Sequence, residues 1–305
     1  AAAAQVVWHW TLIRDRTRIS RLIGTHIGML MRRVEGAAPR VKRAAAESVQ
    51  KAPPLVTQPE ATSEAPAPPP APPTCPEGMA LVERYQGAYC IDRWEAALVR
   101  LEAGAAAVTH PFNQNVDGIE AKVSAVSRRG VRAQGYISGK QAARACSNAG
   151  KRLCEVDEWV RACRGPKLTR YPYGDERQPN LCNDRFKVLD HHPVPILWKK
   201  DPQDPLDEKL MWHPRFMNDK RLLELPNTTA PTGAYAKCTN DYGVYDMVGN
   251  QHEWVNDPEG TFFGGFFMDT FQNGQGCEYR TGGHPFDYHD YSTGFRCCAD
   301  PRSEP

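Results

Sequence analysis

Ten cysteines constrain this 305-residue chain more than any other feature, because all of them lie after residue 74. An even number of cysteines confined to one part of a chain favours disulfides formed in an oxidising compartment. A zinc site is the weaker alternative, since the sequence has no Cys-x-x-Cys knuckle. We therefore expect a disulfide-bonded domain with an extracytoplasmic location, either periplasmic, envelope-associated or secreted.

Composition divides the chain into three regions. Residues 1–51 carry ten Lys or Arg against three acidic residues, a net charge of +7. The whole chain carries +2, so the remainder is left with about −5. Residues 52–74 form a Pro/Ala-rich linker, a composition typical of extended and semi-rigid segments. Residues 75–305 have the mixed composition of a globular domain.

The basic region is predicted to be an amphipathic helix. Its apolar residues recur at the spacing of one helical face, and they are Ile19, Leu22, Ile23, Ile27, Leu30, Met31 and Val34. Such a helix is marginal alone, so residues 5–50 are expected to bind a protein partner, a larger assembly or a lipid surface. A solvated tail is the open alternative. No nucleic-acid partner is expected, and the apolar start before Arg14 falls short of the ~20 residues that span a bilayer.

Local signals in the domain predict few regular elements. Apolar and polar residues alternate around Gln86-Gly87, which indicates a hairpin. Ser138 and Gln141 have the spacing of a capping box and predict a short helix ending near Gly150. A second short helix, which ends at Gly165, is expected to place Trp159, Ala162 and Cys163 on one face. Gly, Pro, Asn and Asp dominate much of the chain beyond this helix, so we expect an irregular, loop-rich α+β domain.

Seven motifs occur in order along this region. They are CPEGMALV, YCIDRWEA, AGKRLCEVDEWVRACRG, RYPYGDE, YGVYDMVGNQHEWVND, FFGGFF and TGFRCCAD. Together they closely resemble the formylglycine-generating enzyme, or sulfatase-modifying factor, family from about Cys75 to Asp300. The resemblance implies an α+β, irregular and loop-rich variant of the C-type lectin fold, preceded here by the N-terminal helix and the Pro-rich linker.

The resemblance also implies disulfide partners. It pairs Cys146 with Cys297 and Cys163 with Cys277. Cys75 and Cys90 flank the first hairpin and are placed to close it. The remaining cysteines would form two further pairs of unassigned connectivity, and they are Cys154, Cys182, Cys238 and Cys298.

Structural calcium is the cofactor that the resemblance implies. The Gly-Asn turn and Glu-Trp pair of the fifth motif offer Asn250 and Glu253 as oxygen donors to a hard cation. A second family site matches Asn180 and the carbonyl of Leu181, with Asp219 as a weaker third candidate. The alternative for Asn250 is an ordinary turn residue.

Catalysis in this family requires two cysteines that bind copper(I), just after the Gly-Gly of the sixth motif. Counting from Gly264, the first of them falls on Asp269, and the second falls near Gly274. A carboxylate neither binds copper(I) as a thiolate does nor exchanges disulfides. The formylglycine reaction and a copper cofactor are therefore not expected.

The C-terminal loops are a candidate binding surface, because aromatic and acidic residues gather there. The candidate residues are Asp269, His284, Asp287, Tyr288, His289 and Tyr291. Aromatic faces beside carboxylates suit a glycan or a protein ligand, and ordinary loop packing is the alternative. The sequence thus predicts a non-catalytic, exported recognition or assembly module tethered by its N-terminal segment. The rival is a copper- or iron-dependent oxidoreductase of altered chemistry that uses Asp269, His284 or His289.

Overall fold

The computed structural model describes residues 73–302, apart from residue 86 and the segments 103–105, 185–191 and 199–211. The described residues belong to one compact unit, Ala67–Pro305. The helix predicted within residues 5–50 and most of the linker therefore lie outside the described residues. None of the helices in the described part of the chain has the length and apolar character needed to cross a bilayer.

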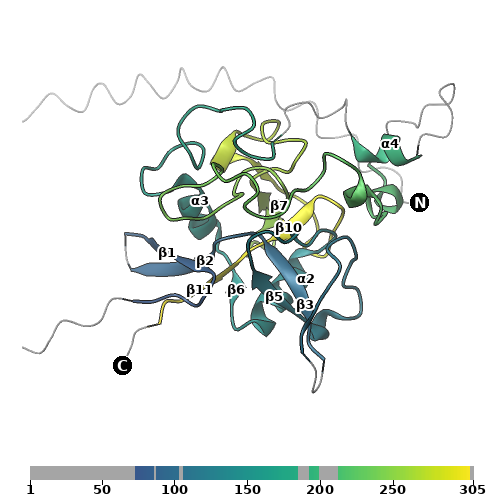
Figure 1. Cartoon of the computed structure of the whole chain (residues 1–305), viewed down its shortest axis with the longest axis horizontal. Helices are drawn as coiled ribbons and strands as arrows, with labels where there is room; N and C mark the ends of the chain where they lie inside the picture. The colour runs from purple at the N-terminus through teal and green to yellow at the C-terminus, as the bar shows by residue number, and fades with distance from the viewer. Residues whose placement is uncertain (1–72, 86, 103–105, 185–191, 199–211, 303–305) are drawn as a thin grey trace, which may run out of the picture. The chain divides into compact units, whose positions relative to one another are not determined.

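One four-stranded sheet joins the start of the domain to its end, in the order β1-β2-β11-β6. Its strands are β1 (Met79–Glu83), β2 (Ala88–Asp92), β6 (Arg152–Leu153) and β11 (Cys297–Ala299). β1 and β2 form the antiparallel hairpin that was predicted around Gln86-Gly87. β11 pairs with β2 on one side and with β6 on the other (Figure 1).

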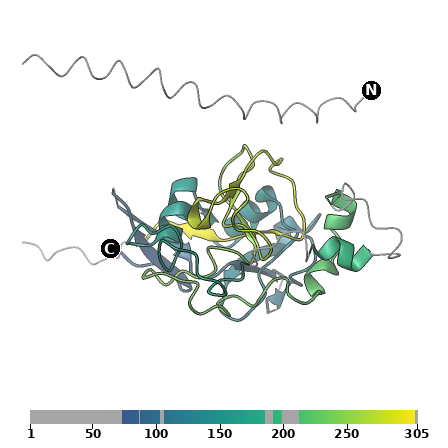
Figure 2. The same ribbon diagram turned by 90° about the horizontal axis from the view of Figure 1, so that it is seen from above.

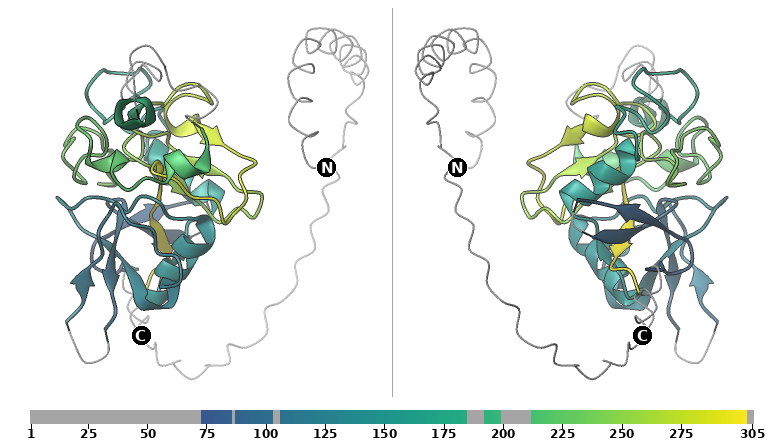
Figure 3. Two further views of the ribbon diagram at one scale, coloured as in Figure 1. Left: turned by 90° about the vertical axis from the view of Figure 1, so that its right-hand side faces the viewer. Right: turned by 90° about the vertical axis from the view of Figure 1, so that its left-hand side faces the viewer.

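Two further sheets complete the framework. The first has the order β10-β7-β8-β9 and contains β7 (His252–Trp254), β8 (Phe262–Phe263), β9 (Arg280–Thr281) and β10 (Thr293–Phe295). The second has the order β4-β3-β5 and contains β3 (Ala96–Arg100), β4 (Val108–Thr109) and β5 (Val123–Ser127). The β7–β10 pair is parallel, and the yellow C-terminal strand passes through the middle of the domain in Figure 3.

Both helices predicted within the domain form, and their caps explain where they begin and end. α2 (Gly139–Asn148) starts with a complete capping box between Ser138 and Gln141. α3 (Val156–Arg164) starts with a second box in which Glu155 is the N-cap, and it stops at Gly165, whose φ is 64°. Left-handed backbone of this kind favours glycine at a helix end. The buried face of α3 includes Trp159 and Cys163.

The other helical elements are short. They are η1 (Glu120–Lys122), α4 (Pro193–Trp198), α6 (Pro214–Met217), η2 (Leu222–Glu224) and η3 (Gly276–Glu278). α4 lies at one end of the domain in Figure 2. Most of the described residues between α3 and β7 lie outside helices and strands. The described residues therefore form the loop-rich α+β domain that the sequence predicted.

Five disulfides bind these loops to the sheets and helices. They are Cys75–Cys90, Cys146–Cys297, Cys154–Cys298, Cys163–Cys277 and Cys182–Cys238. Three of them are the pairs expected from the sequence, and the other two supply the connectivity that the sequence left open. Each bridge over a long loop contributes about 2–4 kcal/mol to stability, which offsets the small amount of regular structure.

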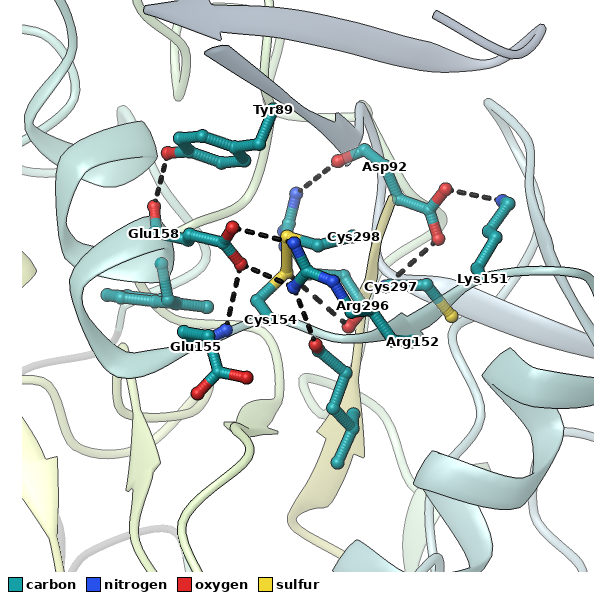
Figure 4. Close-up of a disulfide and its surroundings, with 12 residues drawn as sticks. Tyr89, Asp92, Lys151, Arg152, Cys154, Glu155, Glu158, Arg296, Cys297 and Cys298 are labelled. Carbon is teal, nitrogen blue, oxygen red and sulfur yellow. Dashed lines mark hydrogen bonds and ion pairs between the residues drawn. A yellow bond between two sulfur atoms is a disulfide. The ribbon is translucent and has the colours of Figure 1, made fainter. Parts of the chain in front are cut away.

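The neighbouring cysteines at 297 and 298 bind different partners. Side chains alternate across a strand, so these two residues of β11 point to opposite faces. Cys297 reaches Cys146 on α2, and Cys298 reaches Cys154 just before α3. Figure 4 shows the second bridge beside the ion pair of Arg152 with Glu158, whose two contacts measure 2.6 and 2.7 Å. The adjacent cysteines are structural and do not form a vicinal redox pair.

Candidate functional site

A buried ion pair joins the motif YGVYDMVGNQHEWVND to the motif TGFRCCAD. Glu253 of β7 holds Arg296, which lies between β10 and β11, through two contacts of 2.6 Å. Both side chains are almost completely inaccessible to solvent. Trp159 donates a further hydrogen bond of 2.7 Å to the carboxylate. The guanidinium also donates to the carbonyls of Asp92 and Tyr245, at 3.0 and 2.9 Å.

Two more buried carboxylates, Glu95 and Asp246, interact electrostatically with this pair. Burial raises the pKa of Asp246 to about 6, although the Gly233 amide donates to its carboxylate at 2.6 Å. Burial also raises the pKa of Glu95 well above its usual value, and the charges of Asp246 and Glu253 add to that rise. Arg296 lowers both pKa values, so this single cation stabilises a locally acidic core.

Calcium at Asn250 and Glu253 does not fit this arrangement. The Asn250 side-chain oxygen accepts hydrogen bonds from Asn183, at 2.9 Å, and from the amide of Ala230, at 2.7 Å. Its amide nitrogen donates to Glu95. Both carboxylate oxygens of Glu253 are bound by the Arg296 guanidinium, whose positive charge takes the place that a calcium ion would need on this carboxylate. The oxygen atoms expected to bind calcium bind protein donors instead.

The second expected calcium site has a different setting. Asn180 is exposed and adopts a left-handed conformation, with φ at 65°. The Leu181 amide donates to the carbonyl of Gln178 at 3.4 Å. Asp219, the weaker third candidate, has its carboxylate bound by Arg221 at 2.6 Å. Calcium at Asn180 and the Leu181 carbonyl therefore stays a prediction, without Asp219.

A cavity of about 320 Å³ is the leading candidate for a ligand site. It is formed by residues of the C-terminal sheet and the loops around it. Its wall includes four residues of the predicted binding surface, and these are Asp269, His284, Tyr288 and Tyr291. Phe262 and Phe266 add further aromatic surface. Cavities of this size and composition are common small-molecule sites.

Asp269 is buried and fixed by three donors. One carboxylate oxygen accepts the amides of Phe271 and Gln272, at 2.9 and 3.0 Å. The other accepts the hydroxyl of Tyr279 at 2.9 Å. The residue at the position of the family's first catalytic cysteine therefore closes a turn and orients a tyrosine in the cavity wall.

A second carboxylate organises the opposite part of the wall in the same way. One oxygen of Asp290 accepts the amide and the hydroxyl of Ser292, at 2.6 and 2.7 Å. The other oxygen accepts the hydroxyl of Tyr288. The Ser292 hydroxyl also lies 3.2 Å from Nδ1 of His252, a buried residue of β7 that lines the cavity.

Both histidines of the wall resist protonation. Burial, together with the proximity of His284, lowers the pKa of His252 to about 3. Burial also lowers the pKa of His284, whose ring lies 4.7 Å from that of Tyr288. Neither imidazole therefore brings a positive charge to the cavity near neutral pH.

The structure separates the remaining two residues of the predicted surface from this cavity. Asp287 is exposed and forms an ion pair with Lys140 at 3.3 Å. It lines a different hollow together with His289, whose Nε2 lies 3.6 Å from Asp117. The structure therefore places four of the six predicted residues in one cavity wall and the other two, Asp287 and His289, in the lining of a separate hollow.

Sequence reasoning missed His252, Tyr279, Asp290 and Ser292. His252 lies inside a quoted motif, but its role depends on Ser292, which is 40 residues away and reaches it through the parallel pairing of β7 with β10. Alternation along β7 was the available signal, since it places His252 and Trp254 on the same face.

All ten cysteines lie among the described residues, and every one is disulfide-bonded. No thiolate is thus present in the chain to bind copper(I) or to attack a substrate disulfide. Within the described ranges, no group of three or more His, Cys, Asp or Glu residues is placed so that it could hold a metal ion.

Comparison with known proteins gives one family match. Residues 134–301 match the model of the sulfatase-modifying factor enzyme 1-like domain, which is more than half of the chain.

Individual relatives are more distant. The inactive C-alpha-formylglycine-generating enzyme 2 of Bos taurus is 29% identical over 121 residues, which cover 39% of this chain and 31% of that protein. The formylglycine-generating enzyme of Thermomonospora curvata is 28% identical over 196 residues, covering 54% of this chain and 55% of that protein. The chain thus spans about one third of the length of the bovine relative and just over half of the length of the bacterial one. Among solved structures, the Major Tropism Determinant I1 variant is 12% identical, covers 77% of this chain and 55% of its own, and has a TM-score of 0.40.

Proposed function

Because the chain belongs to the sulfatase-modifying factor enzyme 1-like family, we propose that it is a non-catalytic member that recognises a ligand. Membership confirms the resemblance found in the sequence, and with it the α+β, loop-rich, C-type-lectin-like fold class. Membership does not imply the reaction, since the bovine relative is itself named inactive.

The state of the cysteines carries this proposal. The family's reaction oxidises a substrate cysteine and needs thiolates at the site, whereas here all ten cysteines are in disulfides. Cys277, the cysteine that follows Asp269 in the sequence, is bound to Cys163 of α3. Asp269 itself is held by three hydrogen bonds and makes a turn. The scaffold retains a cavity in this region without the groups that perform the oxidation.

Incubation with a sulfatase-type cysteine peptide, copper and oxygen tests the absence of activity. We expect no aldehyde product by mass spectrometry, because no thiolate is available to hold copper(I). A formylglycine-generating enzyme of the same family, assayed beside it, serves as the positive control. Conversion of the peptide by this chain at a rate comparable to the control would refute the proposal.

The rival reading is an oxidoreductase that uses Asp269, His284 or His289. The cavity contains the first two, but Asp269 has its oxygens committed to protein donors and His289 lies in another hollow. Metal analysis of the same purified sample separates the two readings. Copper or iron at one ion per chain would favour the oxidoreductase, and calcium alone would favour the recognition module and support the prediction at Asn180 and Leu181.

The same proposal includes export and tethering. Five disulfides are typical of proteins that fold in an oxidising compartment, which supports an extracytoplasmic location. Residues 5–50 would bind a protein partner, an assembly or the envelope, and the Pro-rich linker would hold the ligand-binding domain away from that anchor. The ligand on the C-terminal loops would be a small molecule, a glycan or a part of another protein.

Deletion of residues 1–51 tests the tether. We expect the full chain to sediment with the envelope fraction of its host and the deletion variant to remain in the soluble fraction. The deletion leaves the disulfide-bonded unit Ala67–Pro305 complete, so its folding is checked by thermal melting. Equal sedimentation of the two proteins would remove tethering from the proposal and leave the ligand-binding domain unaffected.

A further inference from the structure

Among the described residues, the cavity wall carries negative charge without a basic residue to balance it. Two carboxylates, Asp269 and Asp290, line the cavity. No Lys or Arg is among the described residues that line it, and burial lowers the pKa of both histidines of the wall. An anion brought into this space would meet two carboxylates in a partly dehydrated environment, which is unfavourable.

The two carboxylates are built into the wall in the same way. In each, one oxygen accepts two hydrogen bonds from the chain just after it, and the other accepts a tyrosine hydroxyl. The pairs are Asp269 with Tyr279 and Asp290 with Tyr288. The oxygen that binds the tyrosine retains a free lone pair in each case. Each pair therefore fixes a carboxylate and an aromatic ring side by side.

Aromatic rings in this setting attract cations. The face of a phenol ring is electron-rich, and a hydroxyl that donates to a carboxylate makes it more so. Tyr279, Tyr288, Phe262, Phe266 and Tyr291 all contribute to the wall. Burial and the adjacent Asp290 raise the pKa of Tyr288, so its hydroxyl keeps its proton.

His252 adds a hydrogen-bond acceptor. The Ser292 hydroxyl donates to Asp290 at 2.7 Å, so its oxygen accepts from Nδ1–H of His252 at 3.2 Å. That tautomer leaves Nε2 with a lone pair. Nε2 is buried and has no hydrogen-bond partner among the described residues. A buried acceptor without a partner is costly, and a ligand that donates an N–H would satisfy it.

We propose that this cavity binds the ammonium group of a small organic amine. The proposal rests on the recognition function proposed above and names the chemical class of its ligand. The two Asp–Tyr pairs supply charge and aromatic faces, and the imidazole of His252 supplies an acceptor for an N–H of the ammonium. A volume of about 320 Å³ holds an amine with one ring but not an extended peptide.

Three ligands of one shape test the proposal by charge alone. Benzylamine, benzyl alcohol and benzoate share a ring and differ in carrying a positive, neutral or negative group at pH 7.5. Calorimetric titration of the full chain is expected to show benzylamine binding at least about tenfold more tightly than benzyl alcohol, and no binding of benzoate. Equal affinities for the first two ligands, tighter binding of benzoate, or binding of none of the three at millimolar concentration would overturn the proposal.

Matched variants test the residues. Asp290→Asn keeps the shape of the side chain and removes its charge, so it is expected to weaken benzylamine binding about tenfold and to leave benzyl alcohol unaffected. Asp287→Asn is the control, because Asp287 is three residues away, exposed and outside the cavity. Tyr288→Phe, which keeps the ring, provides a second variant if Asp290→Asn unfolds. The proposal would be contradicted if Asp287→Asn weakened benzylamine binding as much as the cavity variants do, or if neither cavity variant weakened it.

The result of the amine-binding experiments can be distinguished from that of the peptide oxidation assay. Failure to bind amines, with no aldehyde formed, removes the ligand class and leaves a non-catalytic module. Aldehyde formation removes the recognition function and with it the basis of this inference.

Discussion

Arg296→Met is expected to reduce the free energy of unfolding by about 3–5 kcal/mol, because it leaves a buried carboxylate without its partner. The guanidinium makes two contacts of 2.6 Å with Glu253 and is the cation that lowers the pKa values of Glu95 and Asp246. Methionine fills a similar volume, so most of the loss comes from charge. Urea unfolding at neutral pH, followed by tryptophan fluorescence with the disulfides intact, measures it.

The double variant Glu253→Gln/Arg296→Met distinguishes charge from packing. The Glu253→Gln change keeps a side-chain oxygen for the Trp159 indole while removing the unpaired charge, so the double variant is expected to be more stable than Arg296→Met alone. Lys140→Met provides a surface control, since Lys140 pairs with Asp287 in the open, and it should change stability by no more than about 0.5 kcal/mol. A loss below about 1 kcal/mol for Arg296→Met would show that the pair does not hold the core together.

Elements with signals close together in the sequence were predictable. The β1–β2 hairpin, the capping box at Ser138 and the end of α3 at Gly165 each depend on a few neighbouring residues. The family resemblance supplied two disulfide pairs, and the positions of Cys75 and Cys90 beside the hairpin indicated a third. Of the other two, Cys154–Cys298 joins the turn before α3 to strand β11, and Cys182–Cys238 joins two loops. Tertiary packing brings these segments together, and no local pattern specifies the pairs.

The site was less predictable for a physical reason. Carboxylates and carbonyls suit either a metal ion or a guanidinium, and composition does not distinguish the two. The choice at Glu253 was made by Arg296, 43 residues later, which the β7–β10 pairing brings beside it. The cavity likewise combines His252 with Ser292 and Asp269 with Tyr279 across turns. The sequence predicted a binding surface on the C-terminal loops, but it did not indicate which of their side chains share one cavity wall.

His252→Phe is expected to make the protein less sensitive to acid. The pKa of His252 falls from an ordinary 6.5 to about 3 on folding, so below pH 6.5 the unfolded chain takes up a proton that the folded chain refuses. The stability contributed by neutral His252 is complete above pH 6.5 and is lost as the pH falls toward 3. One proton corresponds to about 1.4 kcal/mol per pH unit, so wild type should lose about 2 kcal/mol relative to the variant between pH 7 and pH 5.

The measurement must compare the free energies of unfolding of wild type and variant at the same pH, rather than follow one protein as the pH changes. Asp246 has the opposite sign, because its folded pKa of about 6 lies above its ordinary 3.8, and it stabilises the fold as the pH falls through 6. That contribution is common to wild type and variant and cancels in their difference. Phe266→Leu is the matched control, since its ring lies 4.7 Å from His252 and does not titrate, so it should lower stability equally at both pH values. If His252→Phe also changed the free energy of unfolding by the same amount at both pH values, burial would not be holding the imidazole neutral. Its Nε2 would then no longer be established as an acceptor for an ammonium ligand.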